Sequence, residues 1–184
     1  MKDDILIGDT PKAQLRQGRL KGARATGRLW KHSTLADIGG LVSRDWIAQA
    51  FTVTLVRNPW NRMVSLYCWL RQQEFDNYAV ALAGRSDFAG FLCDPQMQAA
   101  IRAHTYSHYM RDAVGAERAR LFIRLEAFEQ DAQPLWDHLG FRLDLPVLNQ
   151  SDREREHAGY YTTQTAKLVG SLCGEDIARF GYKF

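Results

Sequence analysis

A strand that runs directly into a helix constrains the fold of this chain more than any other stretch of its sequence. Residues 51–56 (FTVTLV) are apolar and β-branched, which is typical of a buried strand. The strand pattern stops at Arg57, and a helix is predicted to follow because Asn58 is a favourable N-cap and Pro59 suits the first helical turn. This strand–helix unit indicates an α/β fold.

The predicted helix has two faces of different chemistry. Its buried face carries apolar and aromatic residues at helical spacing: Trp60, Met63, Val64, Tyr67 and Cys68. Arg62, Ser65 and Trp69 share the opposite face.

Ser65 lies about 10 Å along the helix at about 1.5 Å per residue, and the long side chain of Arg57 spans most of that gap. Donors from the guanidinium, the hydroxyl and the free backbone N–H groups at the helix start favour a bound phosphate. The alternative is that Arg57 closes a loop and Ser65 is an ordinary helix residue.

The remaining elements are predicted from similar signals. Residues 34–49 are predicted to form short helices, opened by a T-x-x-D capping pattern at Thr34 and Asp37 and interrupted at Gly39-Gly40. Ser86 is the predicted N-cap of a later helix. The other predicted elements are short helices over residues 76–112, a second buried strand over 120–125, a helix over 130–139 that Gly140 ends, and a last long helix over 163–173.

The sequence of the strand–helix unit resembles a motif of a known protein family. Residues 56–67 (VRNPWNRMVSLY) resemble the 3′-phosphate-binding motif of sulfotransferases that use 3′-phosphoadenosine 5′-phosphosulfate (PAPS), a pattern of R-x-P, then R, then S eight residues after the first arginine. By this resemblance Arg57 and Ser65 hold the 3′-phosphate. Carbohydrate-type and bacterial members are similar in further segments: residues 29–34 (LWKHST), 122–126 (FIRLE), 149–151 (NQS), Tyr160-Tyr161 and 176–184 (DIARFGYKF).

The resemblance implies a single domain over residues 1–184, with the three-layer P-loop-NTPase-like sulfotransferase fold and a parallel sheet. One part of the family pattern is missing, the first strand and the P-K-x-G-T-type loop that wraps the 5′-phosphosulfate. Residues 5–12 (ILIGDTPK) come nearest to it, but Ala13-Gln14-Leu15 follow where glycine and hydroxyl residues are needed. We expect the chain to begin inside the domain, through a truncated reading frame or as a degenerate copy. A missing strand would also expose the edge of residues 51–56, which favours a homodimer.

The resemblance also implies the catalytic groups. His32 matches the position of a catalytic histidine in similar carbohydrate sulfotransferases, where it takes the proton of the acceptor hydroxyl as general base. Lys31 beside it would stabilise the bridging or sulfonate oxygens. Ser151 and Arg153 lie in a polar loop that would close over the nucleotide. The alternative for His32 is a structural histidine whose hydrogen bonds are formed within its own turn. The alternative for Ser151 and Arg153 is a solvent-exposed run of charged residues.

Two other polar features favour structural roles. His104 and His108 are four residues apart and could share a helix face as metal ligands, but no Glu or Cys completes a site, and PAPS chemistry needs no metal. Glu126 ends the second strand, where its carboxylate is expected to order neighbouring loops through Arg124 or backbone donors.

Charge and composition limit the classes of partner. The net charge is +3, yet residues 10–36 hold seven basic residues and no acid. With its three glycines, the segment 10–30 is predicted to be a basic mobile loop, either simply solvated or attracting the anionic donor or an acidic glycan. No signature of nucleic-acid binding accompanies it.

No transmembrane or signal segment is predicted, and three scattered cysteines favour a reducing compartment, so a cytoplasmic location is expected. The resemblance thus implies transfer of a sulfonate from PAPS to a hydroxyl or amine of a glycan or small metabolite. Because the loop that grips the 5′-phosphosulfate is missing, these 184 residues alone are not expected to transfer sulfonate at a useful rate. The alternative is a non-catalytic remnant that binds nucleotides or polyanions.

Overall fold

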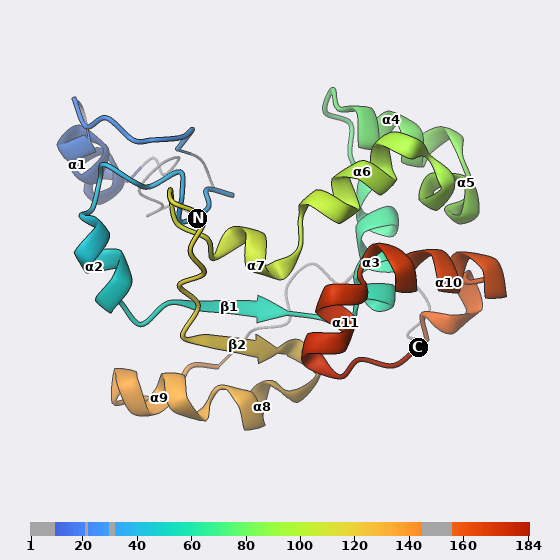
Figure 1. Cartoon of the computed structure of the whole chain (residues 1–184). Coiled ribbons are helices and arrows are strands. Elements are labelled where there is room, and N and C mark those ends of the chain that lie inside the picture. The colour runs from blue at the N-terminus through green and yellow to red at the C-terminus, as the bar shows by residue number, and fades with distance from the viewer. Residues whose placement is uncertain (1–9, 21, 30–31, 145–155) are drawn as a thin grey trace. The chain divides into compact units, whose positions relative to one another are not determined.

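The chain has a mixed α/β structure with a small parallel sheet (Figure 1). The computed structural model describes residues 10–20, 22–29, 32–144 and 156–184. The chain divides into two compact units, the first made of residues 1–54 and 106–122 and the second of residues 55–105 and 123–184. The single domain expected from the sequence stays a prediction.

Two strands pair in the sheet of the described chain. They are β1 (Val53–Val56) and β2 (Leu121–Arg124), which lie side by side in Figure 1. Both predicted strands are therefore confirmed. The first begins two residues later than predicted, and the second is one residue shorter at each end. Val56 and Ile123 are almost fully buried, as β-branched residues on a covered sheet face should be.

The first unit contains three described helices: α1 (Pro11–Leu20), α2 (Arg44–Gln49) and α7 (Tyr106–Tyr109). The loop predicted over residues 10–30 is wrong where α1 lies. Thr10 begins this helix, because its hydroxyl accepts the N–H of Ala13 at 3.1 Å and its carbonyl accepts the N–H of Gln14 at 2.9 Å. Proline follows at the first helical position, so the Thr-Pro pair in the sequence was a start signal that the loop prediction missed.

Two backbone segments of the first unit approach each other closely after α1. The N–H of Thr26 donates to the carbonyl of Gly39 at 2.7 Å, and the N–H of Gly27 donates to that of Asp37 at 3.1 Å. Gly40 has φ +85°, and a Cβ there would lie 2.2 Å from the carbonyl oxygen of Arg24. Glycine is therefore required at residue 40 both by its backbone conformation and by the close approach.

The T-x-x-D pattern forms its expected hydrogen bonds. The N–H of Thr34 donates to Asp37 Oδ2 at 2.8 Å, and the N–H of Asp37 donates to Thr34 Oγ1 at 3.3 Å. These reciprocal bonds close a turn rather than a helix, since the next helix is α2, whose N-cap is Ser43. The first of the short helices predicted over residues 34–49 is therefore wrong, although the capping pattern is real. The helix predicted after Gly39-Gly40 is confirmed as α2.

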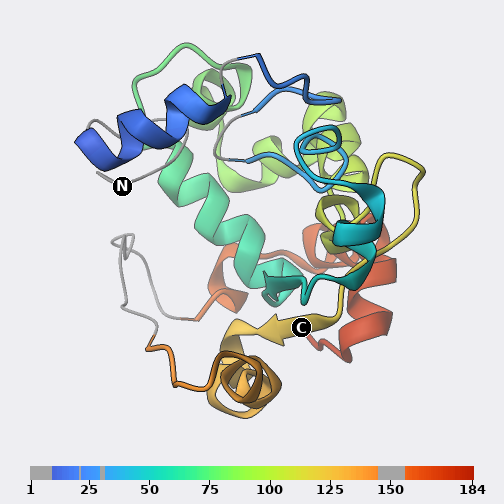
Figure 2. The same ribbon diagram turned by 90° about the vertical axis from the view of Figure 1, so that its left-hand side faces the viewer.

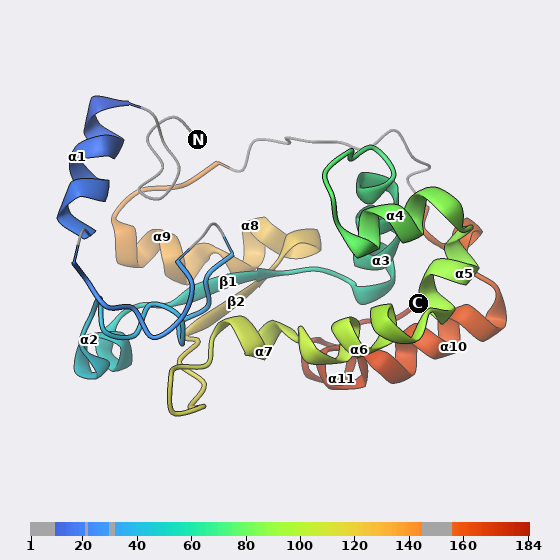
Figure 3. The same ribbon diagram turned by 90° about the horizontal axis from the view of Figure 1, so that it is seen from above.

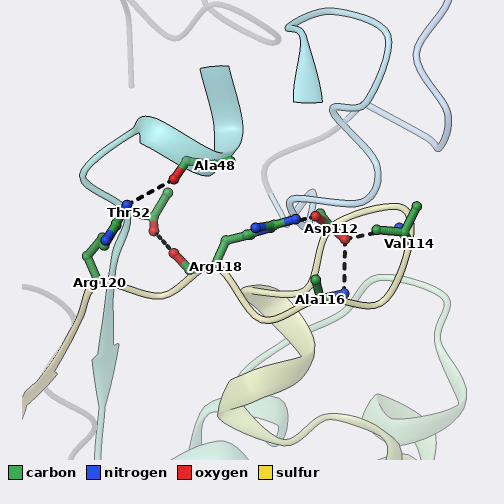
Figure 4. A network of polar contacts seen from close by, with 7 residues as sticks. All are labelled: Ala48, Thr52, Asp112, Val114, Ala116, Arg118 and Arg120. Atoms are coloured by element: carbon green, nitrogen blue, oxygen red, sulfur yellow. Dashed lines mark hydrogen bonds and ion pairs between the residues drawn. The ribbon is translucent and has the colours of Figure 1, made fainter. Parts of the chain in front are cut away.

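A buried carboxylate organises the loop that precedes β2 in the first unit (Figure 4). Asp112 accepts the backbone N–H groups of Val114 and Ala116, each at 3.0 Å, and the Nε–H of Arg118 at 2.7 Å. The Arg118 hydrogen bond is the main cause that holds the pKa of Asp112 below its ordinary value, and the two backbone bonds act in the same direction. Thr52 donates to the Arg118 carbonyl, so the start of β1 is fastened to this loop.

This arrangement predicts a pH-dependent stability. Because the folded state lowers the pKa of Asp112, its carboxylate stabilises the fold above the ordinary aspartate range near about pH 4, and that stability is lost as the pH falls through the folded-state pKa. Asp112→Asn should therefore lower the melting temperature at pH 7, and its difference from the unmutated protein should shrink below about pH 4. Asp45→Asn, at an exposed residue of α2, is the matched control. A pH-independent difference for Asp112→Asn would contradict the prediction.

The second unit is largely helical. Its described α-helices are α3 (Pro59–Leu70), α4 (Tyr78–Arg85), α5 (Phe88–Cys93), α6 (Pro95–Ala103), α8 (Phe128–Asp131), α9 (Gln133–Leu139), α10 (Thr163–Leu172) and α11 (Gly174–Phe180). Two short 3₁₀ helices, η1 (Leu125–Ala127) and η2 (Ala158–Tyr160), precede α8 and α10. None of the helices in the described ranges is long and apolar enough to cross a bilayer.

Helix α3 lies at the centre of the second unit. It packs against α4, α5 and α10, and α10 also runs beside α6 (Figure 3). The core that these helices enclose includes Met63 and Val64 from α3 and Phe91 and Leu92 from α5, all at most 2% exposed. Helices α8 and α9 follow one another after β2 and are seen nearly end-on in Figure 2.

Three predicted boundaries in the second unit need correction. Ser86 ends α4, and Asp87 caps α5 instead, because its carboxylate accepts the N–H of Gly90 at 2.7 Å. The helix predicted over 130–139 is divided at Ala132 into α8 and α9, although Gly140 does end it in the left-handed conformation with φ +76°. Helix α10 is not the last, since α11 follows at Gly174.

Candidate functional site

The turn between β1 and α3 is built around Asn58. Its side-chain oxygen accepts the N–H groups of Trp60 at 3.0 Å and Asn61 at 3.3 Å, and its carbonyl accepts that of Arg62 at 2.8 Å. Pro59 has no N–H. The predicted N-cap and helix start are thus confirmed, but the free backbone donors expected for an anion are already used within the turn. Side chains must therefore supply the donors of any anion site here.

Arg57 extends along α3 rather than away from it. Its Nη2 donates to Asn61 Oδ1 at 2.9 Å, and both residues are half-buried. Ser65, also half-buried, follows Asn61 by four residues, so the two lie on one face of the helix about 6 Å apart along its axis. The guanidinium and the amide thus lie together at the first turn of α3, and the hydroxyl follows one turn later on the same face.

Sequence reasoning missed Asn61. The signal was present, because Asn61 lies four residues before Ser65 within the predicted helix, and residues at this spacing are neighbours on a helix surface. Guanidinium, amide and hydroxyl groups all donate hydrogen bonds, and an arginine fork suits the oxygens of a phosphate. This stripe of three polar residues is the candidate anion site.

The second arginine of the motif is directed elsewhere. Arg62 Nη1 donates to the carbonyl of His104 at 3.5 Å, and the Arg62 guanidinium lies near the thiol of Cys173. Burial raises the pKa of the Cys173 thiol, and the nearby guanidinium opposes that rise. Arg62 therefore links α3 to the helices beside it, although the sequence grouped it with Ser65 on one face.

Glu126 has the structural role that the sequence predicted for it. Its Oε1 accepts the backbone N–H of Asn58 at 2.7 Å, so a residue of the short helix η1 after β2 binds the turn after β1. Arg124 does not share in this bond. It pairs with Asp131 instead, through Nε and Nη2 at 2.7 and 2.8 Å.

Tyrosine 161 supports the first turn of α3. Its hydroxyl donates to the carbonyl of Trp60 at 2.8 Å, and burial raises the pKa of Tyr161 well above its ordinary value. The Trp60 indole in turn donates to the carbonyl of Ala166 in α10 at 2.9 Å. These two hydrogen bonds therefore connect the first turn of α3 to Tyr161 and to α10.

The other residues predicted for the site belong to the first unit or lie outside the described residues. His32 is exposed and belongs to the first unit, where the neighbouring Ser33 donates to the carbonyl of Arg28 at 3.1 Å. Lys31, Ser151 and Arg153 lie outside the described residues. Their predicted roles therefore stay predictions.

The histidine pair does not share one helix. His104 is the C-cap residue of α6, with Nδ1 2.7 Å from the carbonyl oxygen of Ala100, whereas His108 lies in α7. The i, i+4 spacing therefore does not place the two imidazoles on a common helix face, as it would in a continuous helix.

Comparison of the chain with protein-family models, with curated proteins and with solved structures finds no match. The functional interpretation therefore depends on the motif around Arg57 and on the geometry of the turn that carries it.

Proposed function

We propose that this chain is a PAPS-dependent sulfotransferase domain with a three-layer P-loop-like fold. It would transfer a sulfonate group to a hydroxyl or amine of an acceptor, such as a glycan or a small metabolite. The observation that carries the proposal is the stripe on α3. Arg57 follows a parallel strand and donates to Asn61 at 2.9 Å, and Ser65 lies on α3 eight residues after Arg57, which is the spacing of the sulfotransferase motif.

In this proposal the stripe holds the 3′-phosphate of the donor. The Arg57 fork and the Ser65 hydroxyl donate to the phosphate oxygens, and Asn61 keeps the guanidinium aligned with the helix face. His32 would accept the proton of the attacking acceptor group, while Lys31 would balance negative charge on the moving sulfonate. Ser151 and Arg153 would add contacts to the nucleotide.

Nucleotide binding tests the proposal directly. Adenosine 3′,5′-bisphosphate (PAP) should bind to the full chain more tightly than 5′-AMP, which lacks the 3′-phosphate, in isothermal titration calorimetry. Adenosine 2′,5′-bisphosphate, which has the same charge in a different position, is the matched control and should bind more weakly than PAP. Equal binding of PAP and 5′-AMP would refute the proposed function.

A second candidate is non-catalytic binding of a polyanion, which the surface of α1 favours. Lys12, Arg16 and Arg19 lie within one stripe of that helix, and none of the ion pairs among the described residues involves them. Binding of a sulfated polysaccharide, together with equal binding of PAP and 5′-AMP, would support this candidate over the enzyme.

A further inference from the structure

The last residues of the chain lie against the turn that carries Arg57. Asn58 Nδ2 donates to the carbonyl of Lys183 at 2.8 Å. The ring of Phe184 meets that of Trp60 edge to face, with centroids 5.6 Å apart. The turn before α3 and the first residues of that helix are thus in contact with a segment more than 120 residues later in the sequence.

Glu126 joins the same two segments. Its Oε1 accepts the N–H of Asn58 at 2.7 Å, and its Oε2 accepts the hydroxyl of Tyr182 at 3.4 Å. One carboxylate therefore connects the end of β2, the turn before α3 and the end of the chain. All of these residues belong to the second unit.

Asn58 is the point at which these contacts meet. Its side-chain oxygen caps α3, its amide nitrogen binds the chain end and its backbone N–H binds Glu126. Arg57 is the preceding residue, and its guanidinium must lie along α3 to reach Asn61. The conformation of Asn58 therefore determines the direction in which the Arg57 side chain leaves the backbone.

We infer that Glu126 and the tail Tyr182–Phe184 are positioning residues for the Arg57 anion site. This inference rests on the proposed function. None of the four residues donates to the anion. They fix the turn before the anion arrives, so that binding does not have to order the Arg57 side chain. A site ordered in advance binds more tightly than one that the ligand must order.

The exposure of these groups makes the inference testable. Glu126 is exposed and Phe184 is 55% exposed, so their removal opens no cavity in the core. Glu126→Ala removes the acceptor of the Asn58 N–H, whereas Glu126→Gln keeps an acceptor oxygen at the same place. Phe184→Ala removes the ring contact with Trp60. Glu129→Ala is the matched control, because Glu129 is an exposed acid near Glu126 that pairs with Arg142.

The experiment measures the affinities of PAP and 5′-AMP for the full chain by calorimetry, together with hydrogen exchange of the amides of residues 58–62. Glu126→Ala and Phe184→Ala should each lower PAP affinity by about 3- to 10-fold, leave 5′-AMP affinity almost unchanged and speed amide exchange in the turn. Glu126→Gln should recover most of the PAP affinity, and Glu129→Ala should match the unmutated protein.

Different results identify which proposal fails. If the unmutated chain prefers PAP and all variants keep that preference, the positioning inference is wrong while the proposed function stands. An equal loss of PAP and 5′-AMP affinity would indicate a general structural role and would also overturn the inference. If the unmutated chain binds both nucleotides equally, the proposed function fails, and the inference fails with it. Should Glu126→Ala not fold, Phe184→Ala decides the result by the same comparison.

Discussion

Replacement of His32 by alanine is expected to lower the turnover of sulfonate transfer by about 10²–10⁴, the usual effect of losing a general base. The acceptor hydroxyl must give up its proton as it attacks the sulfonate, and a neutral imidazole is suited to take it. The affinity for PAP should change little, because the candidate anion site lies on α3. The measurements are kcat and the Kd for PAP in a form of the protein that transfers sulfonate from PAPS.

His108→Ala is the matched control for this experiment. His108 is also exposed and also belongs to the first unit, but no role in transfer is proposed for it. Its replacement should leave turnover near that of the unmutated protein. Near-normal turnover in His32→Ala itself would contradict the role of His32 as general base. It would favour the alternative, a structural histidine whose hydrogen bonds are formed within its own turn.

Local sequence signals predicted the centre of the second unit well. The β-branched run before Arg57 forms β1, and Asn58 with Pro59 begins α3 at the expected residue. The predicted apolar face of α3 is buried at Trp60, Met63, Val64 and Tyr67, and half-buried at Cys68. These features were accessible because capping, proline geometry and helical periodicity depend only on residues within a few positions of one another.

Contacts between distant segments could not be predicted in the same way. The bond from the Asn58 N–H to Glu126 joins residues 68 positions apart, and the bond from Asn58 to Lys183 joins residues 125 apart. No local pattern indicates which carboxylate or carbonyl will meet a given turn. The direction of Arg62 is a similar case, because the neighbours that it contacts, His104 and Cys173, come from elsewhere in the chain.

Some errors were avoidable. The sequence around Thr10-Pro11 was compared with a phosphate loop, so its ordinary meaning as a helix start was overlooked, and α1 was predicted to be a loop. Likewise, the backbone donors at the start of α3 were expected to serve an anion. The same Asn58 that was recognised as the N-cap was bound to occupy them, since capping means accepting those N–H groups.

Arg57→Ala is expected to abolish the preference of the chain for PAP over 5′-AMP. The guanidinium supplies a charge-assisted hydrogen bond to the 3′-phosphate, and loss of such a bond costs about 1.5–3 kcal/mol, or about 10- to 150-fold in affinity. The affinity for 5′-AMP should stay nearly constant, because that nucleotide has no 3′-phosphate. Titration calorimetry with both nucleotides measures the two effects in one experiment.

Two further variants show whether the geometry of the fork matters as well as its charge. Arg57→Lys keeps the positive charge but cannot donate both to Asn61 and to a phosphate in the planar arrangement of a guanidinium, so its preference for PAP should be intermediate. Arg102→Ala removes an exposed arginine from α6 in the same unit and should leave the preference intact. If Arg57→Ala and Arg102→Ala weaken PAP binding equally, the effect comes from net charge alone, and the stripe on α3 is not the phosphate site.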